Sequence, residues 1–183
     1  MRVIEQLSAY TAAAIKRAVP DHPASEAVLK YALEGIYNAL FIITLSLIIS
    51  AITGRVGEAA TLLLAFAVLR QITGGIHLKS GTLCVLVSTA TVTLLSFVPV
   101  STPLFFFGQT VSLLLILLFA PSRIERQSRF PKSLYPLLKG MGLLLILANL
   151  WIHSSMIAAA FFVQSLTLIR LPVSLNRRGG ESL

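Results

Sequence analysis

The feature that most constrains this chain is a run of 30 residues, from Gly140 to Ile169, that carries no formal charge. As a single α-helix at about 1.5 Å per residue it would be about 45 Å long, whereas the hydrocarbon core of a bilayer is about 30 Å thick. The run is therefore too long for one crossing, and we expect it to divide near His153, Ser154 and Ser155. Two membrane-spanning helices joined by a short outer turn are predicted.

Further apolar runs precede this one. The chain is 56% apolar and 12% charged, with a mean hydropathy of +0.85, against about 45–50% and about 25% for a soluble domain. We therefore predict an all-α integral membrane protein with six transmembrane helices, four of them full spans and the others shorter or re-entrant. The six apolar runs cover residues 36–52, 59–69, 83–98, 104–120, 137–152 and 155–171.

The N-terminal region has a different pattern. Apolar side chains recur every three or four residues over 2–18, which is typical of an amphipathic helix. That helix is either packed on the cytoplasmic side or anchored at the membrane interface. Pro23 is suited to open the next helix and Gly54 to end it. We treat the chain as a single membrane domain comprising an amphipathic cytoplasmic or interfacial region (1–35), a transmembrane bundle (36–172) and a cytoplasmic tail (173–183).

The basic residues predict the orientation of the bundle. Lys and Arg collect in short cytoplasmic loops and near the cytoplasmic ends of spans. With the N-terminus inside, 14 of the 15 basic residues fall on the cytoplasmic side and only Arg55 lies outside. A net charge of +8 on a soluble chain would suggest nucleic acid. Here the apolar content indicates a lipid bilayer as the partner, and we expect no nucleic-acid binding.

The segment from Leu69 to Cys84, between the second and third spans, is too polar for a span and too apolar for an ordinary loop. Arg70 follows a run of only 11 apolar residues. It either enters a hydrated cavity, which would indicate function, or ends a short tilted helix at the surface. Gly74, Gly75 and Gly81 permit unusual backbone conformations and predict a re-entrant or broken helix.

This segment also contains the chemistry of a thiol enzyme. Cys84 is the only cysteine, so no intramolecular disulfide can form, and we expect neither a metal nor a cofactor. A nearby His77, Arg70 or helix N-terminus would stabilise its thiolate, and backbone N–H groups there could bind an oxyanion. On a straight helix His77 and Cys84 would be about 10.5 Å apart, so catalysis requires a bend, which we expect near Gly81.

Without such a bend, a single cysteine in a span is more often a packing residue. No acid lies close in sequence to orient His77. We therefore expect the orienting or oxyanion groups to come from the neighbouring polar residues or from a backbone carbonyl. The candidates are Arg70, Gln71, Thr73, Gly75 and Ser80.

Arg70, Gly74-Gly75, His77 and Cys84 resemble, in identity and spacing, the motif of the accessory gene regulator B (AgrB) family. The resemblance extends over nearly the whole chain. Members of this family are membrane cysteine endopeptidases of Gram-positive bacteria that cut a small propeptide, AgrD, and cyclise it into a thiolactone or lactone signal. The resemblance implies His77 as base, Cys84 as nucleophile, an AgrD-like propeptide as substrate, a homodimer, and a multi-pass location in the bacterial cell membrane with the active site towards the cytoplasm.

Two other interpretations remain open at this point. The chain could be a non-catalytic membrane peptide carrier or transporter component, in which Arg70 and the glycine break line a binding cavity. It could also be a structural membrane scaffold.

The loop from Arg123 to Lys139 is rich in basic residues. This basic loop either binds the acidic tail of a substrate or only reflects the distribution of positive charge across the membrane. Its candidate residues are Arg123, Arg126, Arg129 and Lys132.

Overall fold

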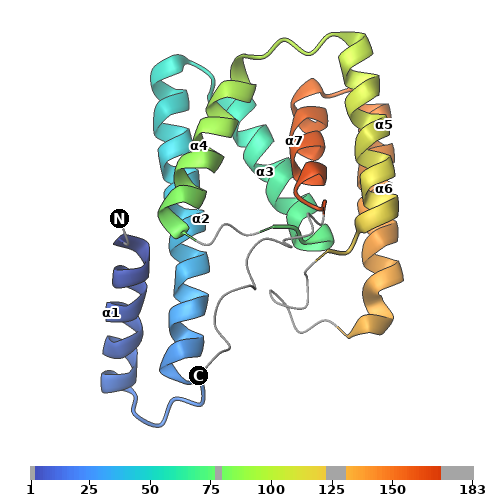
Figure 1. Ribbon diagram of the computed structural model, residues 1–183. Coiled ribbons are helices and arrows are strands. Elements are labelled where there is room, and N and C mark those ends of the chain that lie inside the picture. Colours follow the sequence, from blue (N-terminus) through green and yellow to red (C-terminus); the bar gives the residue numbers. More distant parts are fainter. Residues whose placement is uncertain (1–2, 77–79, 123–130, 170–183) are drawn as a thin grey trace, which may run out of the picture.

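The computed structural model describes residues 3–76, 80–122 and 131–169, and these ranges are helical with short connections (Figure 1). A 3-10 turn, η2 (Lys132–Leu134), leads into α6. The fold is that of an all-α membrane protein, as the apolar runs predict. In chain order the α-helices are α1 (Val3–Ala18), α2 (Glu26–Thr53), α3 (Val56–Thr73), α4 (Gly81–Phe97), α5 (Thr102–Phe119), α6 (Tyr135–Ile152) and α7 (Ser155–Leu166).

The helices from α2 to α7 alternate in direction, which matches the up-and-down arrangement expected of six spans (Figure 1). Four segments are long and apolar enough to cross a membrane: α2, α3, α5 and the segment Lys132–Ile152. The other two apolar helices, α4 with 17 residues and α7 with 12, are shorter. The sequence-based expectation of four full spans and additional shorter segments is thus confirmed.

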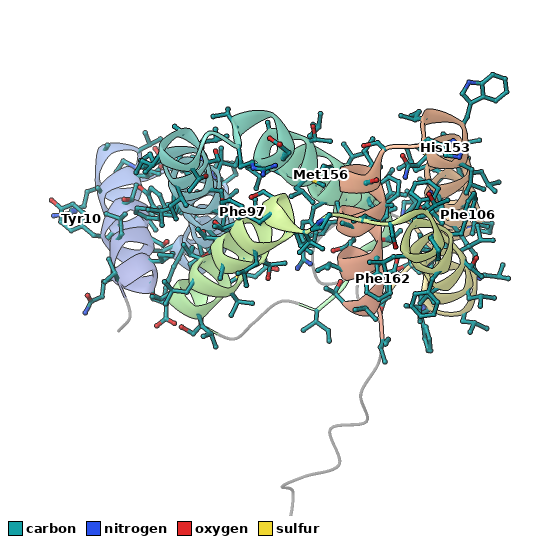
Figure 2. The ribbon with its side chains drawn as sticks, turned by 90° about the horizontal axis from the view of Figure 1, so that it is seen from above. Tyr10, Phe97, Phe106, His153, Met156 and Phe162 are labelled. Atoms are coloured by element: carbon teal, nitrogen blue, oxygen red, sulfur yellow. The ribbon has the colours of Figure 1, made fainter. Side chains whose placement is uncertain are left out.

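The side chains are distributed as in a protein surrounded by lipid. Leu64, Leu94 and Leu118 expose about two thirds of their surface, at 69%, 68% and 69%. Seen along the bundle, many side chains point outward from the layer of helices, including Tyr10 of α1 at one edge (Figure 2). Polar side chains such as Gln109 and Asn149 are buried. Because hydrocarbon replaces water as the solvent of the outer face, this reversal of the soluble pattern supports a membrane location.

Several helix ends lie where their cap residues place them. Gly54, at φ 71°, ends α2 as predicted, and its N–H donates to Ser50 O. His153, at φ 55°, separates α6 from α7, so the long uncharged run does divide where expected. The expected start of α2 at Pro23 is wrong. The helix begins at Glu26, because the Ser25 hydroxyl accepts the Val28 N–H at 3.3 Å and supplies a better cap.

Helix α1 packs on α2 and buries Ile4, Ser8 and Ala12. The hydroxyls of Thr11 and Tyr37 are 3.0 Å apart across this contact. The amphipathic pattern of residues 2–18 therefore corresponds to a helix packed against the bundle, and its first described turn also approaches the start of α4.

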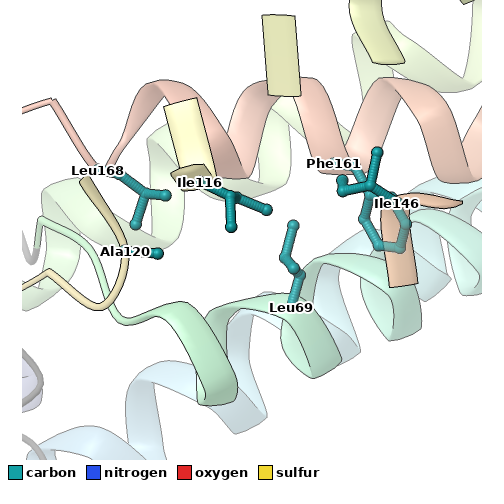
Figure 3. Packing of buried hydrophobic residues seen from close by; sticks show 6 residues of the cluster. All are labelled: Leu69, Ile116, Ala120, Ile146, Phe161 and Leu168. Atoms are coloured by element: carbon teal, nitrogen blue, oxygen red, sulfur yellow. The ribbon is translucent and has the colours of Figure 1, made fainter. Parts of the chain in front are cut away.

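Helix α3 lies between the two sides of the bundle and contacts α2, α4, α6 and α7. One buried cluster joins it to α5, α6 and α7 through Leu69, Ile116, Ala120, Ile146, Phe161 and Leu168 (Figure 3). Leu69 is fully buried and directly precedes Arg70. The end of α3 is therefore held by close packing at the position where the polar motif begins.

The ends of α3, α5 and α7 and the start of α4 lie at about the same height, part-way along the longer α2 (Figure 1). Arg55 lies at the opposite end of the bundle, after α2, and pairs with Glu58 at 3.1 Å. The residues of the motif thus gather at one level, set back from the N-terminal ends of α2 and α6.

Candidate active site

The polar motif begins where α3 ends, and three separate chain segments meet there. Gly75 N–H donates to Ser122 O and Ser122 N–H donates to Thr73 O, both at 2.9 Å. Ile76 N–H donates to Thr167 O at 3.0 Å. Residues 74–76 therefore run between the segments that follow α5 and α7 and pair with both. Helix α3 stops at Thr73 and α4 starts at Gly81, so helical structure breaks here, and the described residues of the connection, 74–76 and 80, contain no re-entrant helix.

The break depends on two glycines with positive φ, 72° at Gly74 and 136° at Gly75. Residues with a side chain rarely adopt a φ of 136°. An added Cβ at Gly75 would also collide with Thr167 Oγ1 and lie 3.3 Å from Gln164 Nε2. Gly75 thus permits the close approach of α7 to the motif.

Arg70 projects from the last turn of α3 and is partly buried. Its Nη2 donates to Ile76 O at 2.7 Å, its Nη1 donates to Gln164 Oε1 at 3.4 Å, and its guanidinium lies 5.8 Å from the Phe66 ring centroid. Among the described residues no carboxylate pairs with Arg70. Its charge is therefore held inside the site and is available to an anion.

Cys84 lies in the first turn of α4, as predicted, and is partly exposed. The Arg70 guanidinium is close enough to interact electrostatically with it. Ser80 caps the helix. Its Oγ accepts the Leu83 N–H at 3.4 Å and its carbonyl accepts the Cys84 N–H at 3.0 Å. The expectation that N–H groups of this turn bind an oxyanion is therefore wrong for Leu83 and Cys84, because both are already bonded.

Beside Gly81 the chain is not helical, because Ser80 has the extended values φ −104° and ψ 121°. Gly81 itself is the first residue of α4, and its φ is not among the positive values. Positive φ values occur earlier in this connection, at Gly74 and Gly75, and residues 77–79 lie outside the described residues. Gly81 allows close packing, because an added Cβ would lie 3.1 Å from Asn38 Oδ1 and 3.4 Å from Ile4 Cβ. The start of α4 is thus fitted against α1 and α2.

Some of the remaining predicted site residues are described by the structure, and the others lie outside its described ranges. Gln71 is exposed, and Thr73 is buried with its hydroxyl donating to Leu69 O at 2.8 Å. Lys132 is exposed at the start of η2. His77 and the three arginines of the basic loop, Arg123, Arg126 and Arg129, lie outside the described residues.

The two other histidines have structural positions. His22 Nδ1 accepts the Ala24 N–H at 3.1 Å in the connection before α2. His153 stacks on Phe105 with ring centroids 5.3 Å apart and lies beside Phe106 (Figure 2). It ends α6, and the turn between α6 and α7 lies at the opposite end of the bundle from the end of α3 (Figure 1). Within the described ranges, no three His, Cys, Asp or Glu side chains are grouped so as to hold a metal ion.

A family model described as Accessory gene regulator B matches residues 8–171, which include the whole motif and nearly the whole chain. The chain belongs to the Accessory gene regulator B (AgrB) family. The comparisons with curated proteins and with solved structures each gave no match. Membership of the AgrB family supports a role in the accessory gene regulator system.

Sequence reasoning did not identify two buried amides of this AgrB chain that lie against the motif. Asn38 of α2 faces Gly81, and Gln164 of α7 contacts Gly74 and Arg70. The signal was available in both cases, since an amide inside an apolar helix is costly unless it has a partner. Nothing in one sequence indicates that Gln164 bonds to the motif, and Asn38 Oδ1 is buried with no hydrogen-bond partner among the described residues.

Proposed function

We propose that this AgrB chain is a membrane cysteine endopeptidase that cleaves the C-terminal tail of an AgrD-like propeptide and cyclises the remainder. The observation that carries the proposal is the position of the only cysteine, Cys84, at a helix start within electrostatic range of the partly buried cation of Arg70. A cation near a thiol favours the thiolate, which is the nucleophilic form. A packing cysteine would not require an arginine nearby that pairs with no carboxylate among the described residues.

In the proposed reaction, His77 takes the proton of the Cys84 thiol, and the thiolate attacks the carbonyl carbon of the scissile peptide bond to form a tetrahedral oxyanion. The C–N bond then breaks, His77 donates a proton to the departing amine, and the peptide remains attached to Cys84 as a thioester. A thiol or hydroxyl of the same peptide loses its proton to His77 and attacks this thioester. The Cys84 thiolate departs, and the product is a thiolactone or a lactone.

Arg70 is the described residue best suited to stabilise the oxyanion. A guanidinium has five N–H donors, so its bonds to Ile76 O and Gln164 Oε1 leave geometric capacity for a third contact. The first-turn amides of Leu83 and Cys84 are already bonded. Electrostatic stabilisation of this kind is often the largest single contribution to catalysis.

The location suits cyclisation better than hydrolysis. The ring-closing nucleophile belongs to the bound peptide and has a high effective concentration, whereas water at a site walled by lipid-facing helices is restricted. We place the site towards the cytoplasm of a bacterial cell membrane, on the basis of the positive charge on that side. We further propose a homodimer, and a contribution of Arg123, Arg126, Arg129 and Lys132 to binding an acidic substrate tail.

A peptide carrier of the same family fold is the alternative, and mutation of the nucleophile separates the two. We expect Cys84→Ala and His77→Ala to abolish release of processed peptide from a synthetic propeptide in proteoliposomes, and Cys84→Ala also to abolish the acyl-enzyme seen by mass spectrometry. Ser88→Ala, one turn further along α4, is the matched control and should process normally. Processing by Cys84→Ala at the wild-type rate would contradict the peptidase assignment and favour the carrier.

A further inference from the structure

We propose that Gln164 of α7 is a positioning residue that holds both the backbone leading to His77 and the Arg70 guanidinium beside Cys84. This inference rests on the proposed function, because it assigns a role to Gln164 in the same site. Gln164 lies 90 residues or more from these partners in the sequence. It is fully buried, with 0% of its surface exposed.

The amide nitrogen of Gln164 holds the backbone of the motif. Its Nε2 donates to Gly74 O at 2.6 Å and is 3.3 Å from Thr73 Oγ1, to which it also donates. Gly74 is the residue at which α3 breaks. An apolar side chain at position 164 would leave the Gly74 carbonyl buried without this donor, which is a costly state for a backbone group.

The amide oxygen of Gln164 holds the cation. Its Oε1 accepts from Arg70 Nη1 at 3.4 Å and from Thr167 Oγ1 at 3.3 Å. Arg70 Nη2 in turn donates to Ile76 O at 2.7 Å. Gln164, Arg70 and the segment 74–76 thus form a closed set of hydrogen bonds, in which displacement of the glutamine displaces the other two.

This set ends at Ile76, one residue before His77 in the chain, and its Arg70 interacts electrostatically with Cys84. Ile76, which directly precedes His77, is fixed by Arg70 Nη2 and by its own N–H bond to Thr167 O. On the other side, Ser80 is fixed as the cap of α4, and only residues 77–79 separate it from Ile76. Because a misplacement of about 1 Å can cost on the order of 100-fold in rate, loss of Gln164 should reduce catalysis without removing any group that reacts.

Gln109 provides the matched control. It is also a buried glutamine, and its Nε2 donates to a helix carbonyl, Ile146 O, at 3.2 Å. It lies in the middle part of α5, away from the end of that helix that adjoins the motif. Replacing either residue by Met removes one buried amide and keeps a similar side-chain length. A purely structural role for Gln164 would make the two variants behave alike.

The experiment measures two quantities in folded protein, with melting temperature as the test of folding. The first is kcat and KM for a synthetic AgrD-like propeptide. We expect Gln164→Met to lower kcat on the order of 100-fold while KM stays near the wild-type value, and Gln109→Met to change neither. The second is the rate of alkylation of Cys84 by iodoacetamide, which is specific because the chain has no other cysteine. We expect it to fall in Gln164→Met alone.

If Gln164→Met does not fold, the same two measurements are made on Gln164→Glu. This variant keeps an acceptor for Arg70 and loses the donor to Gly74 O. A folded Gln164 variant with kcat and alkylation rate equal to those of Gln109→Met overturns the inference. The two proposals fail separately. Processing by Cys84→Ala would contradict the peptidase assignment, whereas the alkylation rate needs no propeptide and still reports whether Gln164 positions the groups around the thiol.

Discussion

Two glycines of α6 allow the packing of α6 against the end of α3 to be tested, with one glycine as the control for the other. An added Cβ at Gly142 would lie 3.0 Å from Thr73 Cγ2 and 3.4 Å from Ile116 Cγ2, whereas one at Gly140 would meet nothing within 4 Å. Carbon atoms prefer separations of about 3.5–4.0 Å. Thr73 cannot easily withdraw, because its hydroxyl donates to Leu69 O and accepts from Gln164.

The magnitude follows from two opposing terms. Replacing Gly by Ala inside a helix favours folding by about 1 kcal/mol, and this gain is common to both positions. Overpacking of a close-packed interior costs about 1–3 kcal/mol, and this cost applies at Gly142 alone. We therefore expect Gly140→Ala to be more stable than wild type by up to about 1 kcal/mol, and Gly142→Ala to lie about 1–3 kcal/mol below Gly140→Ala.

The assay is reversible unfolding in mixed micelles, together with peptide processing. Gly142→Ala should also process more slowly than Gly140→Ala, since Thr73 adjoins Gly74 at the break in α3. Adding Thr73→Ser removes the Cγ2 methyl but keeps the hydroxyl, so the double variant should regain most of the lost stability. Equal stability of the two alanine variants, or no recovery with Thr73→Ser, would refute this account of the interface.

Three further predictions concern the site and the topology. Gly81→Val should insert into the membrane but lose most activity, because its side chain would meet Asn38 and Ile4; full activity would show that the start of α4 can move without cost. Replacing Arg123, Arg126 and Arg129 by Gln should raise KM for an acidic-tailed propeptide more than it lowers kcat, and an unchanged KM would leave those charges a topological role only. In a Cys84→Ala background, cysteines placed at Thr102 and Ser154 should be labelled only from outside the cell; labelling only from the cytoplasm would exclude the six-span topology.

Hydropathy located the helices because it reports directly on contact with lipid. The boundaries depended on other forces. The second apolar run was predicted to cover 59–69, yet α3 extends from Val56 to Thr73, because the backbone hydrogen bonds of a helix continue past the last apolar side chain. Pro23 was a reasonable first residue for α2, but the Ser25 hydroxyl satisfies an N–H that a proline cannot satisfy.

Local patterns also predicted the break and drew attention to the proposed nucleophile. The pair Gly74-Gly75 indicated an unusual backbone conformation, and Cys84 was the only thiol in the sequence. The close packing of Gly81 was not foreseen, since a glycine at a close contact and a glycine at a turn are identical in sequence. Gln164 could not be connected to Gly74 from one sequence, because their pairing depends on how α7 returns against α3.

The shortness of α7 makes bilayer thickness a variable of this site. Twelve residues give about 18 Å of helix, against a hydrocarbon core of about 30 Å. A bilayer around α7 must either thin locally or leave the end of the helix, with Gln164, below the headgroups. Lengthening the acyl chains of the lipid would then place the Arg70 charge deeper in a medium of low dielectric constant and carry the departing tail further from water. For such a site, a change in lipid chain length changes both the dielectric constant around the Arg70 charge and the access of water.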